Sequence, residues 1–239
     1  MSDKPVSPTQ SRQLDGRDGV DAFLQAVDKT PPAAVRDGRG RLVFSLDATA
    51  SRQRTWDQAM TLQNDMFVNT RGIGELDVQL VYYRGFDECR ASKWLNNADK
   101  VVAMMRKVSC QAGTTQINRV LKHAIAEARR VPVQALVFIG DCVEEDVDML
   151  GNLAGQCGLL NMPVFVFQEG RNSSAEFAFK QIASLSGGAH CRFDQSSAKM
   201  LGDLLNAVAA YAAGGKKALL QLQQQGSNQA KALLQQIGK

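Results

Sequence analysis

The chain has 239 residues, of which 44% are hydrophobic and 22% are charged, so it is long enough to bury one substantial core and to carry additional terminal sequence. Its 28 basic and 24 acidic residues give a formal net charge of +4, and the basic residues form no dense cluster interleaved with aromatic residues. This charge distribution does not predict nucleic-acid binding. The sequence has no signal segment and no long apolar run, so neither secretion nor membrane insertion is predicted.

The cysteines are odd in number, widely spaced and form no CxxC pair, which is typical of reduced thiols in a cytoplasmic protein. They are Cys89, Cys110, Cys142, Cys157 and Cys191. The only histidines, His123 and His190, do not pair with a cysteine at the spacing of zinc ligands, so no zinc site is expected.

The N-terminal region divides into two parts. Residues 1–18 are polar and contain Pro5 and Pro8, which predicts a disordered leader. Residues 19–40 are predicted to form a short amphipathic helix and a linker, from four apolar residues at helical spacing: Val20, Phe23, Leu24 and Val27. We expect this helix to pack on the main domain, with binding to a partner protein as the alternative.

The main domain is predicted over 41–213, where apolar runs alternate with helical patterns. Strands are predicted at 42–46, 76–83, 88–94, 135–139, 164–167 and 189–193, and helices at 55–69, 98–108, 117–128, 147–154, 175–182 and 201–212. This alternation predicts an α/β fold with a doubly wound, mostly parallel six-stranded sheet and helices on both faces. The short turn at Gly85-Phe86-Asp87 predicts a hairpin, and therefore one antiparallel edge strand.

Polar side chains at alternate positions follow the first predicted strand, in the run Asp47-x-Thr49-x-Ser51. Open α/β sheets bind ligands at the carboxyl ends of their strands. Oxygen atoms spaced in this way can converge on a hard cation such as Mg²⁺. The alternative is a turn that only caps the following helix.

Two more oxygen-bearing segments are expected at the same edge of the sheet. The loop 109–115 precedes a predicted helix, and Asp141 follows the strongest predicted strand, 135–139. In the predicted topology both reach the edge that carries Asp47, whereas a capping aspartate would need neither. The convergence favours a cation site.

These segments resemble the metal-ion-dependent adhesion site of von Willebrand factor A domains. The resemblance covers roughly residues 40–212 and rests on Asp47-x-Thr49-x-Ser51, Gly113-Thr114-Thr115-Gln116-Ile117 and Phe138-Ile139-Gly140-Asp141. It implies a divalent cation, usually Mg²⁺, with Mn²⁺ or Ca²⁺ as alternatives. It also implies direct ligation by Thr49 and Ser51, a contribution from Thr115, and direct or water-mediated contacts from Asp47 and Asp141.

The resemblance leaves a choice between two threonines in the second segment, and two residues differ from the usual pattern of the family. Thr115 is preferred to Thr114 because Ile117 and Leu121 then stand at the offsets usual for the family. Thr49 replaces the commoner serine and keeps the hydroxyl. Cys142 stands where the family usually has glycine, either as a redox-sensitive thiol beside the metal or, as we favour, as a small buried residue.

The resemblance implies a protein-binding module in which an acidic residue of the partner completes the coordination of the cation. Intracellular members of the family serve as adaptors beside ATPase or chaperone-type complexes, so we expect a cytoplasmic, bacterial adaptor or scaffold. Arg84, Asp87, Glu88 and Cys142 are expected at the rim that meets the partner, with solvated turn charges as the alternative for the first three. The acidic residues Glu144, Glu145, Asp146 and Asp148 could form a second rim, but they are better explained as negative charge at a helix N-terminus.

Two other classes of function remain as alternatives. A metal-dependent phosphoesterase-type hydrolase could use the same cation, but the sequence has no P-loop and no GxSxG elbow, and His123 is expected on an exposed helix face, so no enzyme is predicted. The tail 214–239 is rich in Gln and Leu at helical spacing and predicts a helix. Self-association through 216–239 would make the chain an oligomerising structural protein.

Overall fold

A computed structural model of the chain describes residues 39–54, 56, 75–193, 208 and 212. Five predicted segments lie wholly or mostly outside these residues, so their assignments stay predictions: the leader, the N-terminal helix with its linker, the helix at 55–69, the helix at 201–212 and the tail. The elements in chain order are β1 (Arg39–Asp47), η1 (Ala50–Arg52), β2 (Glu75–Arg84), β3 (Glu88–Ala91), α3 (Ala98–Met105), α4 (Ile117–Arg130), β4 (Ala135–Gly140), α5 (Val147–Leu159), β5 (Val164–Glu169), α6 (Ser173–Ser186) and β6 (Ala189–Phe193).

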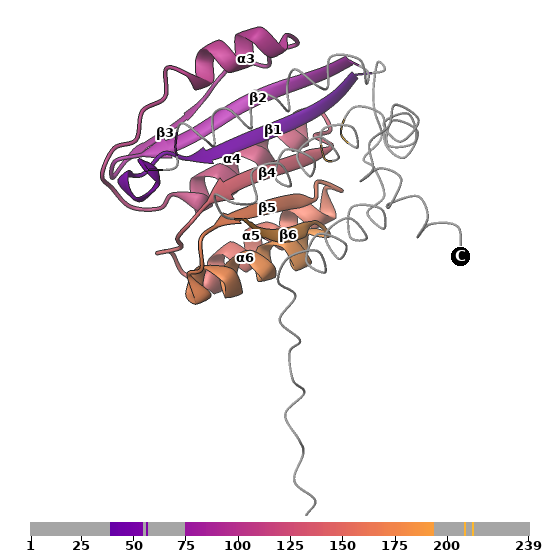
Figure 1. Cartoon of the computed structure of the whole chain (residues 1–239). Helices are drawn as coiled ribbons and strands as arrows, with labels where there is room; N and C mark the ends of the chain where they lie inside the picture. Colours follow the sequence, from indigo (N-terminus) through magenta and orange to yellow (C-terminus); the bar gives the residue numbers. More distant parts are fainter. Residues whose placement is uncertain (1–38, 55, 57–74, 194–207, 209–211, 213–239) are drawn as a thin grey trace, which may run out of the picture.

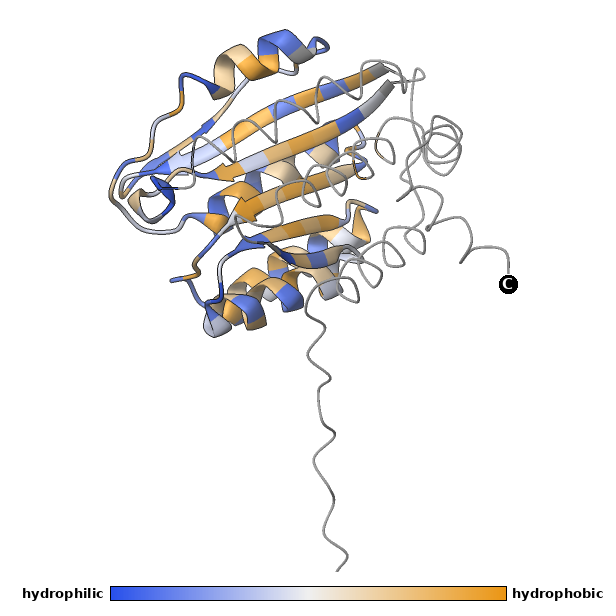
Figure 2. Cartoon of the chain, viewed as in Figure 1, coloured by the Kyte–Doolittle hydropathy of each residue, from blue (hydrophilic) through white to orange (hydrophobic). Residues whose placement is uncertain are grey.

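The strands form one six-stranded sheet in the order β3-β2-β1-β4-β5-β6 (Figure 1). Every neighbouring pair is parallel except β2 with β3, which is antiparallel at the edge. Figure 2 shows that the central strands β1, β4 and β5 are largely hydrophobic, as strands buried on both faces must be. The predicted fold class is confirmed.

Each face of the sheet packs a separate apolar layer. On one face, Leu42 and Phe44 of β1 pack in a cluster with α3 and with Trp56, Val208 and Ala212. On the other face lie α4, α5 and α6, whose apolar stripes meet residues such as Val43, Val81 and Leu136. α4 shows why: its buried residues recur at helical spacing, at Ile117, Val120, Leu121, Ala124 and Ile125. The sheet therefore packs apolar residues on both of its faces.

The third strand is shorter than predicted, because it ends at Ala91 and not at residue 94. The Leu80 amide donates to the hydroxyl of Ser92 at 3.0 Å instead of to a main-chain carbonyl. Pairing resumes between Val78 and Leu95, which leaves one extra residue on this strand relative to β2. An extra residue on an edge strand is a β-bulge, and it ends the regular ladder.

The helix predicted at 98–108 is also shorter and ends at Met105. The amides of Lys107 and Val108 donate to the carbonyls of Met104 and Met105, so the chain leaves the helix in a tighter turn. None of the helices within the described ranges has the length and apolar character needed to cross a membrane.

Candidate metal centre

The carboxyl ends of β1, β2 and β4 lie at one edge of the sheet, beside η1 and the β2–β3 turn on the left of Figure 1. Asp47 ends β1 and pairs in register with Tyr83 of β2. The loop 109–115 joins this edge through the Gln111 amide, which donates to the Ala48 carbonyl at 2.9 Å. The structure thus brings together the three segments that sequence topology placed there.

Asp47 is fully buried, and each of its carboxylate oxygens has a hydrogen-bond donor. The Thr49 amide donates to Oδ1 at 2.8 Å, and the Tyr83 hydroxyl donates to Oδ2 at 2.8 Å. Burial raises the pKa of Asp47, while the hydrogen bonds from Thr49, the nearby Arg52 charge and the Tyr83 hydroxyl act in the opposite direction. These donors offset part of the cost of burying the carboxylate and fix its orientation.

Tyr83 is a residue of this site that the sequence did not identify. Its ring is fully buried, and burial together with the charge of Asp47 raises the pKa of its hydroxyl well above the ordinary value. The available signal was its place at the end of the second predicted strand, but a strand-end tyrosine has many structural explanations. Only the register between β1 and β2 makes it the partner of Asp47.

The hydroxyls of Thr49 and Ser51 lie side by side and share a hydrogen bond of 3.0 Å. A single 3-10 turn, η1, follows Thr49 and places Ser51 next to it. Thr49 is buried and Ser51 is exposed. The pair therefore runs from the interior to the surface, next to the buried Asp47.

The two threonines of the second loop have different environments. Thr115 is buried, its amide donates to Glu144 Oε2 at 2.9 Å, and its hydroxyl accepts from the Glu144 amide at 3.0 Å. Thr114 is exposed, and its amide donates to the Gly85 carbonyl at 3.1 Å. Thr115 is thus tied to the segment that follows Asp141, whereas Thr114 is tied to the hairpin.

Asp141 differs from Asp47 in its hydrogen bonding. Its side-chain Oδ1 is buried and has no hydrogen-bond partner among the described residues. A buried carboxylate oxygen without a donor is costly, and such atoms in native structures call for an explanation. A cation bound at this edge would supply it.

The side chains that the resemblance implies as ligands, Asp47, Thr49, Ser51, Thr115 and Asp141, all end in oxygen atoms. Within the part of the chain that the structure describes, no three His, Cys, Asp or Glu side chains gather as a metal cluster. A cation held by two carboxylates must therefore rely on hydroxyls and water, which suits Mg²⁺ and does not suit the nitrogen and sulfur set of a typical zinc site. The residues present fit a hard divalent cation.

The acidic residues after Asp141 lie at the N-termini of two helices. Asp146 caps α5, accepting from the Met149 amide at 2.7 Å, as predicted. Glu145 instead accepts from the Ile117 and Asn118 amides, at 3.1 and 2.7 Å, at the N-terminus of α4. Negative charge at a helix N-terminus, as predicted, thus describes Asp146 and Glu145, although at two different helices, whereas Glu144 accepts from the Thr115 amide in the loop before α4.

Arg52 is a second residue that the sequence did not identify. Its side chain is fully buried, and Nε lies 2.9 Å from Glu169 Oε2 at the end of β5. Its Nη1 also donates to the Asp47 main-chain carbonyl at 2.9 Å. Arg52 therefore links η1 to the ends of two strands and places a positive charge beneath the acidic edge.

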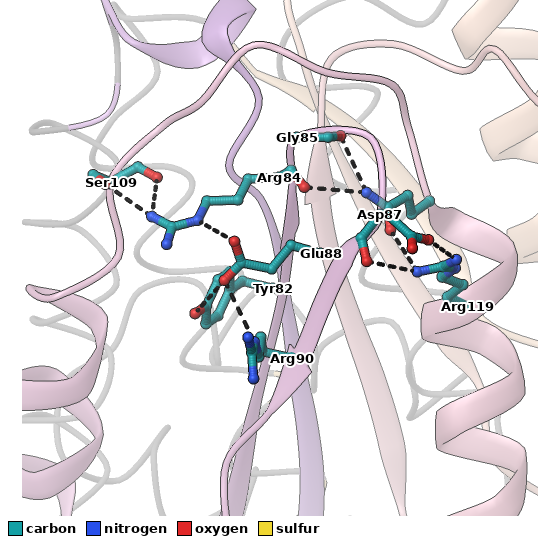
Figure 3. Close-up of polar contacts among 9 residues, drawn as sticks. Tyr82, Arg84, Gly85, Asp87, Glu88, Arg90, Ser109 and Arg119 are labelled. Atoms are coloured by element: carbon teal, nitrogen blue, oxygen red, sulfur yellow. Dashed lines mark hydrogen bonds and ion pairs between the residues drawn. The ribbon is translucent and has the colours of Figure 1, made fainter.

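Three of the residues predicted for the rim, Arg84, Asp87 and Glu88, lie at the β2–β3 turn and form ion pairs within the chain (Figure 3). Arg84 Nε lies 3.0 Å from Glu88 Oε2, and Arg84 Nη1 donates to the Ser109 hydroxyl at 2.9 Å. Asp87 pairs with Arg119 of α4. The hairpin is therefore fastened to the loop after α3 and to α4 by its charged residues.

Cys142 and His123 are both half-buried. Burial and the charges of Asp141 and Glu144 raise the pKa of the Cys142 thiol, which keeps it protonated at neutral pH. All five cysteines are free thiols. His123 was predicted to be exposed, but it is half-buried. Its Nε2 shares a 2.8 Å hydrogen bond with Gln79 Oε1 on the sheet, which draws the ring inward.

Comparisons with known proteins identify the fold. A von Willebrand factor type A protein from Catenulispora acidiphila superposes with a TM-score of 0.61 at 14% identity, over 74% of this chain and 43% of that one. The chain has a von Willebrand factor A fold. Proximal thread matrix protein 1 of the mussel byssus, with a zinc-occupied metal-ion-dependent adhesion site, gives 0.58 at 14% identity, over 73% and 47%.

A third structure has the same fold: an aerotolerance-related membrane protein from Bacteroides fragilis with multiple mutations to serines. It superposes with a TM-score of 0.54 at 16% sequence identity, and the match covers 70% of this chain and 98% of that one. The chain spans less than half the length of the Catenulispora and mussel chains. No family model and no curated protein sequence matches the chain. At these identities the likeness establishes the fold of this chain, and its function has to be argued from its own residues.

Proposed function

We propose that this von Willebrand factor A fold carries a metal-ion-dependent adhesion site, and that the chain is a protein-binding adaptor whose partner completes the coordination of the cation. The observation that carries the proposal is the buried Oδ1 of Asp141, which has no hydrogen-bond partner within the described ranges and lies at the edge that holds the hydroxyls of Thr49 and Ser51. A cation is the ligand that would satisfy this oxygen and use the adjacent hydroxyls together.

The proposed ligands have distinct roles. Thr49, Ser51 and Thr115 contribute hydroxyl oxygens, and Asp141 contributes a carboxylate oxygen. Asp47 has a donor on each carboxylate oxygen, which suits a water-mediated role in which it orients the other groups. Mg²⁺ is the proposed cation, with Mn²⁺ and Ca²⁺ as competitors, since all three bind oxygen ligands. The zinc in the mussel protein supports divalent-cation binding by this type of site.

The proposed cation would attract a carboxylate from a partner protein. Mg²⁺ commonly keeps several water ligands, and an acidic side chain can replace one of them. A charge-assisted contact of this kind makes binding metal-dependent and selective. We propose that the rim formed by the β2–β3 turn and Cys142 surrounds this contact.

Metal binding is tested by isothermal titration calorimetry of Mg²⁺ into the metal-free protein. Ser51→Ala removes one proposed ligand and Asp141→Asn removes the negative charge of another, and we expect each to lower the affinity at least about tenfold. Asp148→Asn is the matched control, since Asp148 is exposed in the first turn of α5, and it should bind as the wild type does. Equal affinity in all four proteins, or no binding by the wild type, would contradict the proposal.

Partner binding is tested by affinity capture from a lysate in Mg²⁺ and in EDTA, with the same variants. The proposal expects a protein that is retained by the wild type and by Asp148→Asn only in Mg²⁺, and that is lost with Ser51→Ala. A protein retained equally in EDTA would move the interaction away from the cation site.

A further inference from the structure

Phe86 lies at the tip of the β2–β3 turn with 76% of its surface exposed. Turns of this kind usually carry Gly, Asn, Asp or Ser, whose conformational and hydrogen-bonding properties suit them to solvent. Because the Phe86 ring is mostly exposed, it contributes little hydrophobic stabilisation to the fold, and no contact among the described residues gives it a structural role. Its position beside a proposed ligand site is therefore informative.

The main chain on either side of Phe86 is held in place. Gly85 adopts φ +60°, a conformation that L side chains rarely adopt, and this turns the chain at the tip. Its carbonyl accepts from the Thr114 amide at 3.1 Å and from Gln116 Nε2 at 3.2 Å. A Cβ added to Gly113 would lie 1.9 Å from the same carbonyl oxygen, so the loop and the turn are in close contact.

The charged side chains of the turn also fix the tip. Arg84 pairs with Glu88 and Asp87 pairs with Arg119, so these charges partner one another (Figure 3). The prominent unpaired feature of the turn is then the apolar ring of Phe86. An aromatic side chain on a main chain held in this way has only two side-chain torsions to restrict when a partner covers it, so its entropic cost of binding is low.

Phe86 also lies close to a proposed metal ligand. The Gly85 carbonyl is bonded to the amide of Thr114, which directly precedes Thr115. Covalent geometry along this connection limits the distance between the Cα atoms of Phe86 and Thr115 to about 11 Å. An extended peptide advances about 3.3 Å per residue, so side chains two or three positions apart can reach both points.

We propose that Phe86 is the apolar anchor of the partner-binding surface, and that the partner is an extended protein segment with a carboxylate residue two or three positions from a large apolar residue. This inference rests on the proposed metal-dependent function and specifies its partner: the carboxylate meets the cation and the apolar side chain packs on Phe86. A centrally placed aromatic residue beside a desolvated charged contact is the arrangement that dominates binding energy in many interfaces.

The test is a selection from a random-peptide display library with one fixed Asp, carried out in Mg²⁺ and in EDTA. We expect wild-type protein to enrich peptides only in Mg²⁺, with Leu, Ile, Phe or Trp two or three positions from the fixed Asp. Phe86→Ala should lower the affinity of these peptides about tenfold or more and remove the apolar preference while leaving Mg²⁺ affinity unchanged. Phe177→Ala, which removes a 67% exposed phenylalanine from α6, is the matched control and should bind as the wild type does.

The outcomes separate this inference from the function on which it rests. Mg²⁺-dependent peptides without an apolar preference, or with a preference that Phe86→Ala leaves intact, overturn the role of Phe86 and leave the adhesion site standing. Peptides selected without regard to Mg²⁺, or no selected peptides, overturn both. Analytical ultracentrifugation of the same variants adds a further outcome, because self-association in EDTA that Phe86→Ala abolishes would assign Phe86 to contacts between copies of this chain and overturn the inference.

Discussion

Replacing Tyr83 by Phe removes one oxygen atom from the interior and leaves Asp47 Oδ2 without its 2.8 Å donor. The phenyl ring remains and keeps its stacking on Phe138, whose ring centroid lies 6.3 Å away, so no cavity contributes to the effect. A hydrogen bond to a charged group contributes about 1.5–3 kcal/mol, and the loss of this donor leaves a buried acceptor unsatisfied. We therefore expect the free energy of unfolding of metal-free protein to fall by about 2 kcal/mol.

Urea unfolding in EDTA measures this change. With an m-value of about 2 kcal/mol/M, the expected loss moves the midpoint down by about 1 M while m stays constant. Tyr82→Phe is the matched control, because the Tyr82 hydroxyl lies 3.3 Å from Glu88 Oε1 at a half-buried position of the same strand, and it should change the midpoint little. Equal midpoints for the two variants would refute the argument that Tyr83 compensates for the buried charge of Asp47.

Other substitutions test the remaining contacts of the site and the core. Arg52→Met should lower the free energy of unfolding by about 3 kcal/mol in urea unfolding, because it leaves the carboxylate of Glu169 without its buried partner. Gly113→Ala should lower Mg²⁺ affinity in calorimetry and the melting temperature together, since the added Cβ would meet the carbonyl oxygen of Gly85 at 1.9 Å and force the loop away; unchanged values would show that the contact is dispensable. Burial lowers the pKa of His190 to about 4 from 6.5, so between these values the unfolded chain binds more protons and stability falls as the pH drops. The free energy of unfolding should lose about 2 kcal/mol from this residue between neutral pH and about pH 5, and His190→Gln should remove that part of the pH dependence.

The sheet could be predicted from sequence because its signals are local. Apolar runs such as 42–46 and 135–139 belong to strands buried on both faces, and the short turn at Gly85 fixed the direction of β3. The ends of elements were less predictable. β3 stops early because the hydroxyl of Ser92 takes the place of a main-chain acceptor, and nothing in the spacing of apolar residues signals such a substitution.

The site was predictable only where its residues belong to a motif. Asp47 and Asp141 follow strands in a recognisable pattern, whereas Tyr83 and Arg52 act through partners that lie 36 and 117 positions away in the chain. Their roles depend on strand register and on the packing of η1, which no local pattern encodes. Glu145 shows the same limit: its carboxylate caps α4, which begins 28 residues earlier, and no local pattern indicates which helix an acidic residue caps.

The two aspartates of the site are stabilised in opposite ways, and this contrast has a thermodynamic consequence. Asp47 has a donor on each oxygen, whereas Asp141 keeps one buried oxygen without a partner among the described residues. The metal-free protein therefore bears the cost of an unsatisfied carboxylate oxygen that bound Mg²⁺ would remove. Because a ligand that binds only the folded state stabilises it by mass action, the melting temperature should rise with Mg²⁺ concentration. Asp141→Asn should abolish that rise, whereas Asp148→Asn should preserve it, which separates site binding from a general effect of salt.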